Sequence, residues 1–347
     1  MMVQKAVQKL VTRSSLTREE AAAATEEIMT GEATPAQIGA FLVALRMNGE
    51  TLDEITGMAT VMRQKALRVQ TDGEVVDVVG TGGDGMGTFN ISTAAALVTA
   101  ACGVKVAKHS NRAASGTVGS ADILEANGVK LELSPESVKR CIDEVGIGFM
   151  FAQAFHPAMR FAGPPRRELG VRTVFNILGP LTNPAGALYQ VLGVGQATAA
   201  IREGQPALGE MMAKVLASLG TKHSWVVRGD DGLDEITTTT TTQVWEVTGS
   251  RVRQFAVSPE DAGLATAALG DLQATDATSH ASMFQESLGK AACAPKDVVM
   301  MNAAAALVVT GRAADLRAGV QTAREAIDAG TPLAKLGALA ALSQTLE

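Results

Sequence analysis

The sequence predicts an α/β protein, in which a small all-helical domain is joined to a larger α/β domain with a mainly parallel central sheet and helices on its faces. Three observations predict this class. The chain up to about residue 70 carries helix signals, short β-branched runs alternate with helical stretches from Glu74 onward, and hydrophobic residues make up 46% of the 347 residues. Such alternation is typical of parallel sheets, and this hydrophobic fraction is enough to bury a sizeable core.

The N-terminal part contains three helix starts of one kind. Each is a capping box, in which a threonine hydroxyl accepts a hydrogen bond from an amide of the first turn and a longer side chain reaches back. The pairs are Thr17 with Glu20, Thr34 with Gln37, and Thr51 with Glu54. The helix after Thr34 is predicted to end near Gly49 and carries an apolar stripe: Ile38, Phe41, Leu42 and Leu45. The stripe is either packing within the helical domain or a contact surface for a second subunit.

Strand-like runs follow, separated by helices. The predicted strands are residues 75–79, 104–107, 147–151, 191–194 and 224–227, and then a hairpin of residues 244–247 and 251–256. Helices are predicted at residues 93–101 and 297–310, the latter rich in alanine and methionine and buried. The threonine run Thr237–Thr242 is β-prone and indicates no function.

The composition argues against several classes of protein. A net charge of −6 offers no basic footprint for nucleic acid, and no run of about 18 apolar residues is present to span a membrane. Three distant cysteines (Cys102, Cys141 and Cys293) form no C-x-x-C pair, so neither a disulfide scaffold nor a zinc site is expected. The first residues show no cleavage signal, and a cytoplasmic location is expected.

Residues 80–93 are the most informative segment, Gly-Thr-Gly-Gly-Asp-Gly-Met-Gly-Thr-Phe-Asn-Ile-Ser-Thr. Glycine lets the backbone turn sharply and bring amide groups against an anion. The segment leaves a predicted strand and enters a predicted helix. Asn90, Ser92 and Thr93 therefore lie at a helix start, where free amides and the helix dipole favour phosphate. The segment predicts a phosphate-binding loop.

Two better-known phosphate motifs do not fit this loop. Gly80, Gly82 and Gly85 satisfy G-x-G-x-x-G, but the helix starts about seven residues later than the dinucleotide fingerprint requires. No Asp or Glu lies between Gly85 and Ser120 to bind a ribose. A P-loop is excluded because threonine, not lysine, follows Gly87. A purely structural glycine-rich turn remains the alternative.

A second loop, residues 108–122, follows the second predicted strand. It is expected beside the first loop, because the carboxyl ends of parallel strands share one edge of the sheet. Lys105, Lys108 and Arg112 are the only charged residues in a stretch that contains no Asp or Glu. Cations and hydroxyls gathered there suit a ligand with several phosphate charges. A solvated basic loop is the alternative.

An acidic turn follows the strand at residues 224–227. It contains Asp230, Asp231, Asp234 and Glu235. Adjacent carboxylates repel unless a cation lies between them, and magnesium prefers one or two carboxylates together with phosphate oxygens and waters. Asp234 and Glu235 are therefore candidate magnesium ligands, with an acidic surface turn as the alternative.

Residues 149–180 combine aromatic rings with cations. They contain five of the nine phenylalanines, together with His156, Arg166, Arg167 and Arg172. Apolar walls with convergent cations suit a small aromatic acid. The alternative is that the phenylalanines belong to the core and that His156 is structural.

Together these motifs resemble those of the anthranilate phosphoribosyltransferase family. The resemblance rests on residues 80–93, 108–122, 156–159, 166–184 and 232–235, whose order and spacing also match. It extends along the whole chain and is most specific between residues 76 and 235.

The resemblance implies an architecture and a reaction. A small helical, dimerising domain would comprise residues 1–72 with a returning segment near 165–188, and a large α/β domain would comprise residues 73–164 and 189–347, with the active site between them. The expected substrates are phosphoribosyl pyrophosphate (PRPP) and anthranilate, the expected cofactor is Mg²⁺ with two ions, and the expected assembly is a homodimer. The reaction would give N-(5-phosphoribosyl)anthranilate and pyrophosphate, a step of tryptophan biosynthesis.

The resemblance also implies roles for individual residues. PRPP would be held by Gly80, Gly83, Asp84, Thr88, Asn90, Ser92, Thr93, Lys108 and Ser120. Magnesium would be bound by Ser92, Asp234 and Glu235, and anthranilate by Asn111 and Arg166. The predicted catalytic residues are Lys108, Asn111 and Arg166. The wider predicted substrate site adds Ile91, His109, Arg112, Ser115, Gly116 and His156.

Two positions depart from the family pattern. Ser110 replaces a glycine, and Gly116 replaces a second serine. An added Cβ at position 110 is expected to strain the loop or narrow the acceptor channel. Loss of a hydroxyl at position 116 is expected to weaken a phosphate contact by about 1 kcal/mol. These changes leave phosphoribosyl transfer in place and bear on the identity of the acceptor.

In the implied reaction the amine of anthranilate displaces pyrophosphate from C1 of the ribose. Because an aromatic amine is neutral at pH 7, no strong general base is needed, and catalysis is expected to rest on alignment and charge neutralisation. The alternatives are a nucleoside phosphorylase, a related phosphoribosyltransferase with another aromatic acceptor, and a catalytically silent relative that binds nucleic acid or a protein partner.

Overall fold

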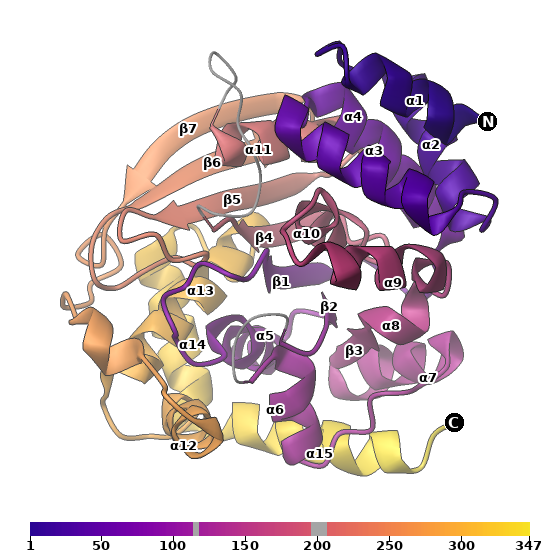
Figure 1. Cartoon of the computed structure of the whole chain (residues 1–347). Helices are drawn as coiled ribbons and strands as arrows, with labels where there is room; N and C mark the ends of the chain where they lie inside the picture. The colour runs from indigo at the N-terminus through magenta and orange to yellow at the C-terminus, as the bar shows by residue number, and fades with distance from the viewer. Residues whose placement is uncertain (114–117, 196–206) are drawn as a thin grey trace.

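A seven-stranded sheet forms the centre of the computed structural model, which describes residues 1–113, 118–195 and 207–347. The strands are β1 (Val76–Gly80), β2 (Val106–Ser110), β3 (Ile147–Phe151), β4 (Tyr189–Gly193), β5 (His223–Gly229), β6 (Thr242–Thr248) and β7 (Arg251–Val257). Their order is β3-β2-β1-β4-β5-β6-β7 (Figure 1). Strands β1 to β5 pair in parallel, and the hairpin β6–β7 adds two antiparallel pairings. The predicted fold class is confirmed.

The chain begins with the helices α1 (Met2–Leu10), α2 (Arg18–Met29), α3 (Pro35–Asn48) and α4 (Leu52–Lys65). All three predicted capping boxes are present, starting α2, α3 and α4. Helix α3 ends where predicted, because Gly49 follows it with a φ of 77° that few other residues adopt. The sequence pattern alone therefore located the starts of α2, α3 and α4 and the end of α3.

The remaining helices lie between and after the strands. They are α5 (Ile91–Ala101), α6 (Ser120–Ala126), α7 (Pro135–Arg140), η1 (Cys141–Val145), α8 (Ala152–Phe155), α9 (Met159–Leu169), α10 (Phe175–Leu178), η2 (Gly179–Leu181), α11 (Leu208–Ser218), η3 (Leu269–Leu272), α12 (Ala277–Ser287), α13 (Ala294–Val309), α14 (Leu316–Asp328) and α15 (Thr331–Gln344). None of the helices in the described ranges is long and apolar enough to cross a lipid bilayer.

The sheet is covered by helices on both faces. Successive residues of a strand point to opposite faces, and β1 shows the consequence. Val78 belongs to a core that includes residues of α5, α13 and α14, whereas Val79 belongs to a core that includes residues of α1–α4 and α11. Both residues are almost completely buried.

Helices α9 and α10 bring the middle of the chain back to its beginning. In Figure 1 they lie between the N-terminal helices and the ends of β1 and β2. Helix α9 packs against α2 and α3, and α10 packs against α4. The carboxyl ends of β1, β2, β4 and β5 therefore face a wall made by α4, α9 and α10.

Most strand boundaries shift by one or two residues from the prediction, and the end of β2 shifts furthest. Strand β2 continues through Lys108 to Ser110 because it pairs in parallel with β3, where Lys108 lies opposite Phe149 and Ser110 opposite Phe151. The second loop therefore begins at Asn111. Lys108 is part of the sheet, and its position is set by strand pairing rather than by the loop.

Candidate active site

A cavity of about 620 Å³ lies at the carboxyl ends of the central strands. Most of the residues predicted to form the site line it: Gly80, Gly83, Asp84, Thr88, Asn90, Ile91, Ser92, His109, Asn111, Arg112, Ser120, His156, Arg166, Asp234 and Glu235. Met62, Met159, Arg172 and Phe175 line it from the helical side. Thr93 and Lys108 are buried behind its wall, and the predicted residues Ser115 and Gly116 lie outside the described residues.

The glycine loop follows β1 and contacts two other parts of the site. Gly80 lies so close to the Asp234 carboxylate that a Cβ at this position would collide with it. Gly83 has a φ of 68°, and the guanidinium of Arg172 occupies the space where its side chain would lie. Nη1 of Arg172 also donates to the carbonyl oxygen of Gly82 at 3.3 Å. Glycine is therefore required at both positions by close approach, and at Gly83 by the positive φ as well.

Lys108 is buried beneath the cavity wall and contacts two of its elements. Its Nζ donates to the carbonyl oxygen of Val78 at 2.7 Å and to Oγ of Ser92 at 3.2 Å. Burial lowers the pKa of Lys108, while the charges of Asp77 and Glu235 oppose that effect. The lysine thus connects β1, the start of α5 and the acidic turn.

The acidic turn closes onto the glycine loop. The amide of Gly82 donates to Oδ2 of Asp234 at 2.6 Å, and the amide of Asp234 donates to Oδ2 of Asp84 at 3.3 Å. The amide of Ser92 donates to the Glu235 carboxylate. The two turns and the three predicted magnesium ligands therefore meet in one place.

The carboxylates of the turn are short of positive charge. Asp234 and Glu235 are each 8% exposed. Burial, reinforced by the charge of Asp84, raises the pKa of Asp234 to about 7. Burial and the charge of Asp234 raise the pKa of Glu235 as well. Such raised values show that additional positive charge would stabilise the ionised pair.

The oxygen atoms gathered here fit magnesium. Within the described ranges, no three or more His, Cys, Asp or Glu residues are placed to hold a metal by themselves. Magnesium does not require such a set, since it retains waters and shares phosphate oxygens with one or two carboxylates. Asp234 and Glu235, with the Ser92 hydroxyl beside them, therefore suit an ion that arrives with a phosphorylated ligand.

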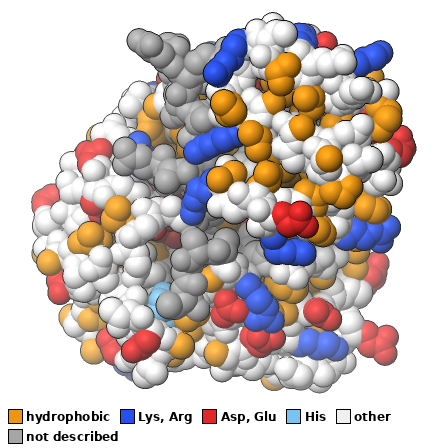
Figure 2. All heavy atoms as spheres, in the orientation of Figure 1, with side chains coloured by type: hydrophobic (Ala, Val, Ile, Leu, Met, Phe, Trp, Pro, Cys, Tyr) orange, Lys and Arg blue, Asp and Glu red, His pale blue; other side chains and the backbone are white. Residues whose placement is uncertain are grey.

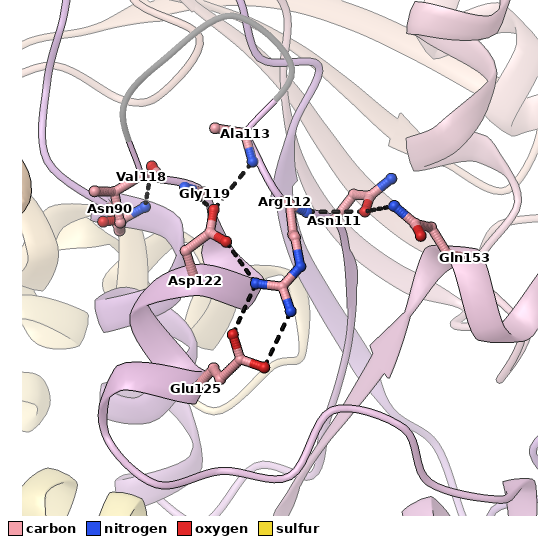
Figure 3. A network of polar contacts seen from close by, with 9 residues as sticks. All are labelled: Asn90, Asn111, Arg112, Ala113, Val118, Gly119, Asp122, Glu125 and Gln153. Atoms are coloured by element: carbon pink, nitrogen blue, oxygen red, sulfur yellow. Dashed lines mark hydrogen bonds and ion pairs between the residues drawn. The ribbon is translucent and has the colours of Figure 1, made fainter. Parts of the chain in front are cut away.

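The second loop is held by its own helix, as Figure 3 shows. Arg112 donates to Oδ1 of Asp122 at 2.7 Å and to Oε2 of Glu125 at 2.8 Å. Oδ2 of Asp122 accepts from the amides of Ala113 and Gly119 at 3.2 and 2.8 Å. Arg112 lines the cavity, but its charge is already matched by two carboxylates.

The lysine that precedes β2 lies away from the cavity. The sequence pattern groups Lys105 with Lys108 and Arg112 in one cationic stretch. Its Nζ donates to Oδ1 of Asp143 at 2.6 Å, and it does not line the cavity. Lys105 lies at the amino end of β2, whereas the site lies at the carboxyl end.

One wall of the cavity, called the aromatic wall below, is formed by His109, His156, Phe175 and Arg166. The ring centroids of His109 and His156 are 5.0 Å apart. Burial lowers the pKa of His109 to about 3 and that of His156 to about 4, so both rings are neutral at pH 7. The Arg166 guanidinium lies 5.8 Å from the centre of the Phe175 ring, and burial, assisted by the charge of Arg172, lowers its pKa. This wall presents apolar surface and cations to a small aromatic anion.

Comparison with known proteins identifies the family to which the chain belongs. Residues 4–66 match the family model for the helical bundle domain of the glycosyl transferase family, and residues 72–333 match that for its α/β domain. A curated anthranilate phosphoribosyltransferase of Chloroflexus aurantiacus is 53% identical over 346 residues, which covers 99% of each chain. The chain belongs to the anthranilate phosphoribosyltransferase family.

Solved structures agree with this family membership. The crystal structure of anthranilate phosphoribosyltransferase from Thermus thermophilus is 42% identical with a TM-score of 0.89 and covers 98% of this chain and 99% of its own. The Saccharomyces cerevisiae enzyme in complex with PRPP and Mg is 25% identical with a TM-score of 0.88, covering 99% of this chain and 98% of its own. The family and enzyme class predicted from the motifs are confirmed.

A set of hydrogen bonds that the motifs did not reveal holds the acidic turn in place. Oδ1 of Asn302 accepts from the amide of Ile236 at 3.0 Å, and its Nδ2 donates to the carbonyl oxygen of the same residue at 2.8 Å. The hydroxyl of Thr237 donates to Oδ2 of Asp231 at 2.7 Å, and the amide of Thr237 donates to Oγ1 of Thr242 at 3.0 Å. The threonine run, which indicated no function by itself, thus fixes the turn that carries Asp234 and Glu235.

A second group that the motifs did not reveal connects β1 with β2. The carboxylate of Asp77 is fully buried and accepts from Nδ2 of Asn183 at 2.7 Å and from the amide of His109 at 3.3 Å. Nδ2 of Asn183 also donates to the carbonyl oxygen of Ala107 at 2.8 Å. Burial raises the pKa of Asp77 to about 6, although the charge of Lys108 opposes the shift. A single Asp within a hydrophobic strand pattern was the available signal.

Ser110, which departs from the family glycine, is accommodated without backbone strain. Among the described residues other than glycine, Arg13 alone has a positive φ. Position 110 is the last residue of a regular strand, so of the two expected effects loop strain does not occur, and a narrowed acceptor channel stays a prediction. Oγ of Ser110 donates to Oγ of Ser120 at 3.1 Å, and both residues line the cavity.

Proposed function

We propose that this protein transfers the phosphoribosyl group of PRPP to the amine of anthranilate, forming N-(5-phosphoribosyl)anthranilate and pyrophosphate in tryptophan biosynthesis. One observation carries the proposal: the glycine loop, the acidic turn and the aromatic wall all border the same cavity. A phosphate-binding loop and a pair of metal-binding carboxylates suit the donor, and the aromatic wall suits the acceptor.

The donor is proposed to bind at the glycine loop and the start of α5. The amides of this loop and Asn90, Ser92 and Ser120 supply hydrogen-bond donors for phosphate oxygens. Lys108 contributes positive charge from behind Ser92, to which it is bonded at 3.2 Å. Gly80, which lies against Asp234, is proposed to face both substrates.

Magnesium is proposed to be the cofactor, with two ions. The yeast relative of this family is described in complex with PRPP and Mg, and the raised pKa values of Asp234 and Glu235 indicate carboxylates in need of a cation. When bound, the metal would neutralise charge on the leaving pyrophosphate. Ser92, Asp234 and Glu235 are the residues proposed to hold it.

The acceptor is proposed to bind between Asn111 and Arg166. The Arg166 guanidinium would pair with the anthranilate carboxylate, since no described acid forms an ion pair with it at present. Asn111 would orient the amine. His109 and His156, which are neutral at pH 7, would pack against the ring without adding charge.

The chemistry then requires alignment more than proton transfer. The bond between ribose C1 and the pyrophosphate oxygen breaks while a bond between C1 and the amine nitrogen forms, and the nitrogen afterwards loses a proton to solvent. Because the free amine is neutral, no buried base is needed to start the reaction. Lys108, Asn111 and Arg166 would contribute by placing the two substrates and balancing the charge of the leaving group.

We further propose a cytoplasmic homodimer built through the helical domain, which comprises residues 1–72 with the returning segment near 165–188. Figure 2 shows hydrophobic side chains gathered over the N-terminal helices, at the upper right of the view. Met2, Val11, Met47 and Val171 are among the exposed large hydrophobic residues, and such a surface favours protein association. The three cysteines form no disulfide, which suits a reducing compartment.

The decisive experiment mixes the protein with anthranilate, PRPP and Mg²⁺ and follows the loss of anthranilate fluorescence. We expect loss that depends on both PRPP and Mg²⁺ and that releases one pyrophosphate for each anthranilate consumed. Folded protein that gives a flat trace with anthranilate but turns over another aromatic amine would redirect the acceptor assignment. Phosphorolysis of a nucleoside without magnesium would instead identify a phosphorylase.

A further inference from the structure

The C-terminal part of the chain runs along the second half of the glycine loop. The amide of Phe89 donates to the carbonyl oxygen of Leu272 at 3.1 Å, and the amide of Ala274 donates to that of Gly87 at 2.8 Å. Thr88 and Gln273 form an antiparallel bridge. Nε2 of Gln273 donates to the carbonyl oxygen of Met86 at 2.8 Å. Residues 272–274 thus fix a loop that the sequence motifs treated as a self-contained unit.

The same segment leads into α12, which places one more side chain at this loop. His280 is 4% exposed and lines the cavity. Its Nδ1 lies 3.3 Å from Oδ1 of Asn90, and Nδ2 of Asn90 donates to the carbonyl oxygen of Val118 at 3.0 Å. His280 is therefore connected through Asn90 to both phosphate-binding loops.

The Val118 carbonyl fixes the direction of these hydrogen bonds. The carbonyl of Val118 can only accept, so the Asn90 amide must turn its NH₂ group toward Val118 and its oxygen toward His280. That oxygen can only accept as well, so the proton lies on Nδ1 of His280. Burial lowers the pKa of His280, which keeps the ring neutral at pH 7. A neutral donor orients Asn90 without placing a cation beside it.

We infer that His280 is a positioning residue for PRPP, which holds the Asn90 amide in the orientation that binds the donor, while residues 272–274 fix the backbone of the same loop. The inference rests on the proposed function, because it assumes that Asn90 contacts PRPP. His280 itself acts through Asn90. No role is needed for His280 toward anthranilate, since the acceptor residues Asn111 and Arg166 lie on other elements.

The test compares three substitutions on α12. His280→Ala removes the donor to Asn90, and His280→Asn offers an amide in its place. Gln285→Ala is the matched control, because Gln285 donates from the same helix to Oδ1 of Asn127 at 2.7 Å, away from Asn90. For each variant, KM for PRPP, KM for anthranilate, kcat and the thermal midpoint are measured at saturating Mg²⁺.

We expect His280→Ala to raise KM for PRPP by about five- to tenfold, the effect of one lost hydrogen bond, with KM for anthranilate changed less than twofold. His280→Asn should recover most of the loss, and Gln285→Ala should lower the thermal midpoint without changing KM for PRPP. Equal changes in both KM values, or unchanged PRPP binding in folded His280→Ala, would overturn the inference. Absence of turnover in the unmodified protein would instead refute the proposed function.

Discussion

The amide of Gly82 donates to Oδ2 of Asp234 at 2.6 Å, across 152 positions of sequence. This bond joins the loop after β1 to the turn after β5, and it places a carboxylate beside the backbone proposed to bind phosphate. In the ligand-free protein the loop amide therefore partly compensates a buried acid. When PRPP and magnesium bind, the Gly82 amide can donate to phosphate and the Asp234 carboxylate can bind the metal. The hydrogen bond between Gly82 and Asp234 is then expected to break.

The first prediction concerns Gly80, which lies against the same Asp234 carboxylate. Gly80→Ala adds a Cβ that collides with the Asp234 carboxylate, so the acidic turn must move away from the glycine loop. We expect at least a tenfold loss of kcat/KM, about the effect of misplacing a metal ligand, and a lower thermal midpoint. Gly337→Ala is the control, since nothing lies within 4 Å of the added Cβ. Normal activity of Gly80→Ala would show that the turn has no fixed position.

The parts of this site that depend on local sequence were predictable. Capping boxes, the glycine-rich turn and the acidic turn are patterns of adjacent residues, and their strands end at one edge because parallel pairing places them there. The prediction that Gly80–Thr93 and the pair Asp234–Glu235 lie together holds for this reason. Residue types and spacing carry that information without a structure.

The parts that depend on distant partners were not predictable. The sequence pattern predicts Arg112 as a cation for phosphate, yet it bonds to Asp122 and Glu125 on the following helix. Asn302 holds Ile236 from 66 positions away, and Leu272 and His280 hold residues 89 and 90 in the same manner. A side chain's partner is decided by tertiary packing, so a list of polar residues in one segment cannot reveal it.

A second prediction follows from the raised pKa of Asp234. Its value of about 7 lies above the ordinary value of 3.8, so the folded metal-free protein binds more protons than the unfolded chain between these values. Stability should therefore fall as pH rises from 6 to 8, by about 1 kcal/mol through this residue. Asp234→Asn should lack this component. The measurement is the free energy of unfolding of both proteins in chelator at pH 6 and 8.

Magnesium should reverse this dependence of stability on pH. Binding requires ionised carboxylates, so the apparent affinity for Mg²⁺ in the presence of PRPP should fall on acidification below about pH 7.

Buried histidines that resist protonation also affect stability in acid. Their contribution is the same in the original protein and in Asp234→Asn, so it cancels in the difference between the two free energies of unfolding. Identical pH profiles of the original protein and Asp234→Asn would contradict the raised pKa.

A third prediction tests the acceptor wall. Arg166→Ala removes the cation proposed to pair with the anthranilate carboxylate, and a charged hydrogen bond is worth about 1.5–3 kcal/mol. KM for anthranilate should rise by about tenfold or more, while KM for PRPP changes little. Arg167→Ala, at the neighbouring exposed position that does not line the cavity, is the control. Equal increases in both KM values would remove Arg166 from the acceptor site.

The last prediction separates the two effects of the serine that replaces the family glycine. Ser110→Ala removes the hydrogen bond to Ser120 but keeps the Cβ, whereas Ser110→Gly removes both. Since Ser120 is proposed to contact PRPP, both variants should raise KM for PRPP by about two- to fivefold, within the range expected for one hydrogen bond. Only Ser110→Gly should accept ring-substituted anthranilates better than the original protein, because it alone removes the Cβ beside Asn111. Steady-state kinetics with anthranilate and a bulkier analogue distinguish these outcomes, and a widened acceptor range in Ser110→Ala would mean that the hydroxyl, not the Cβ, limits the acceptor.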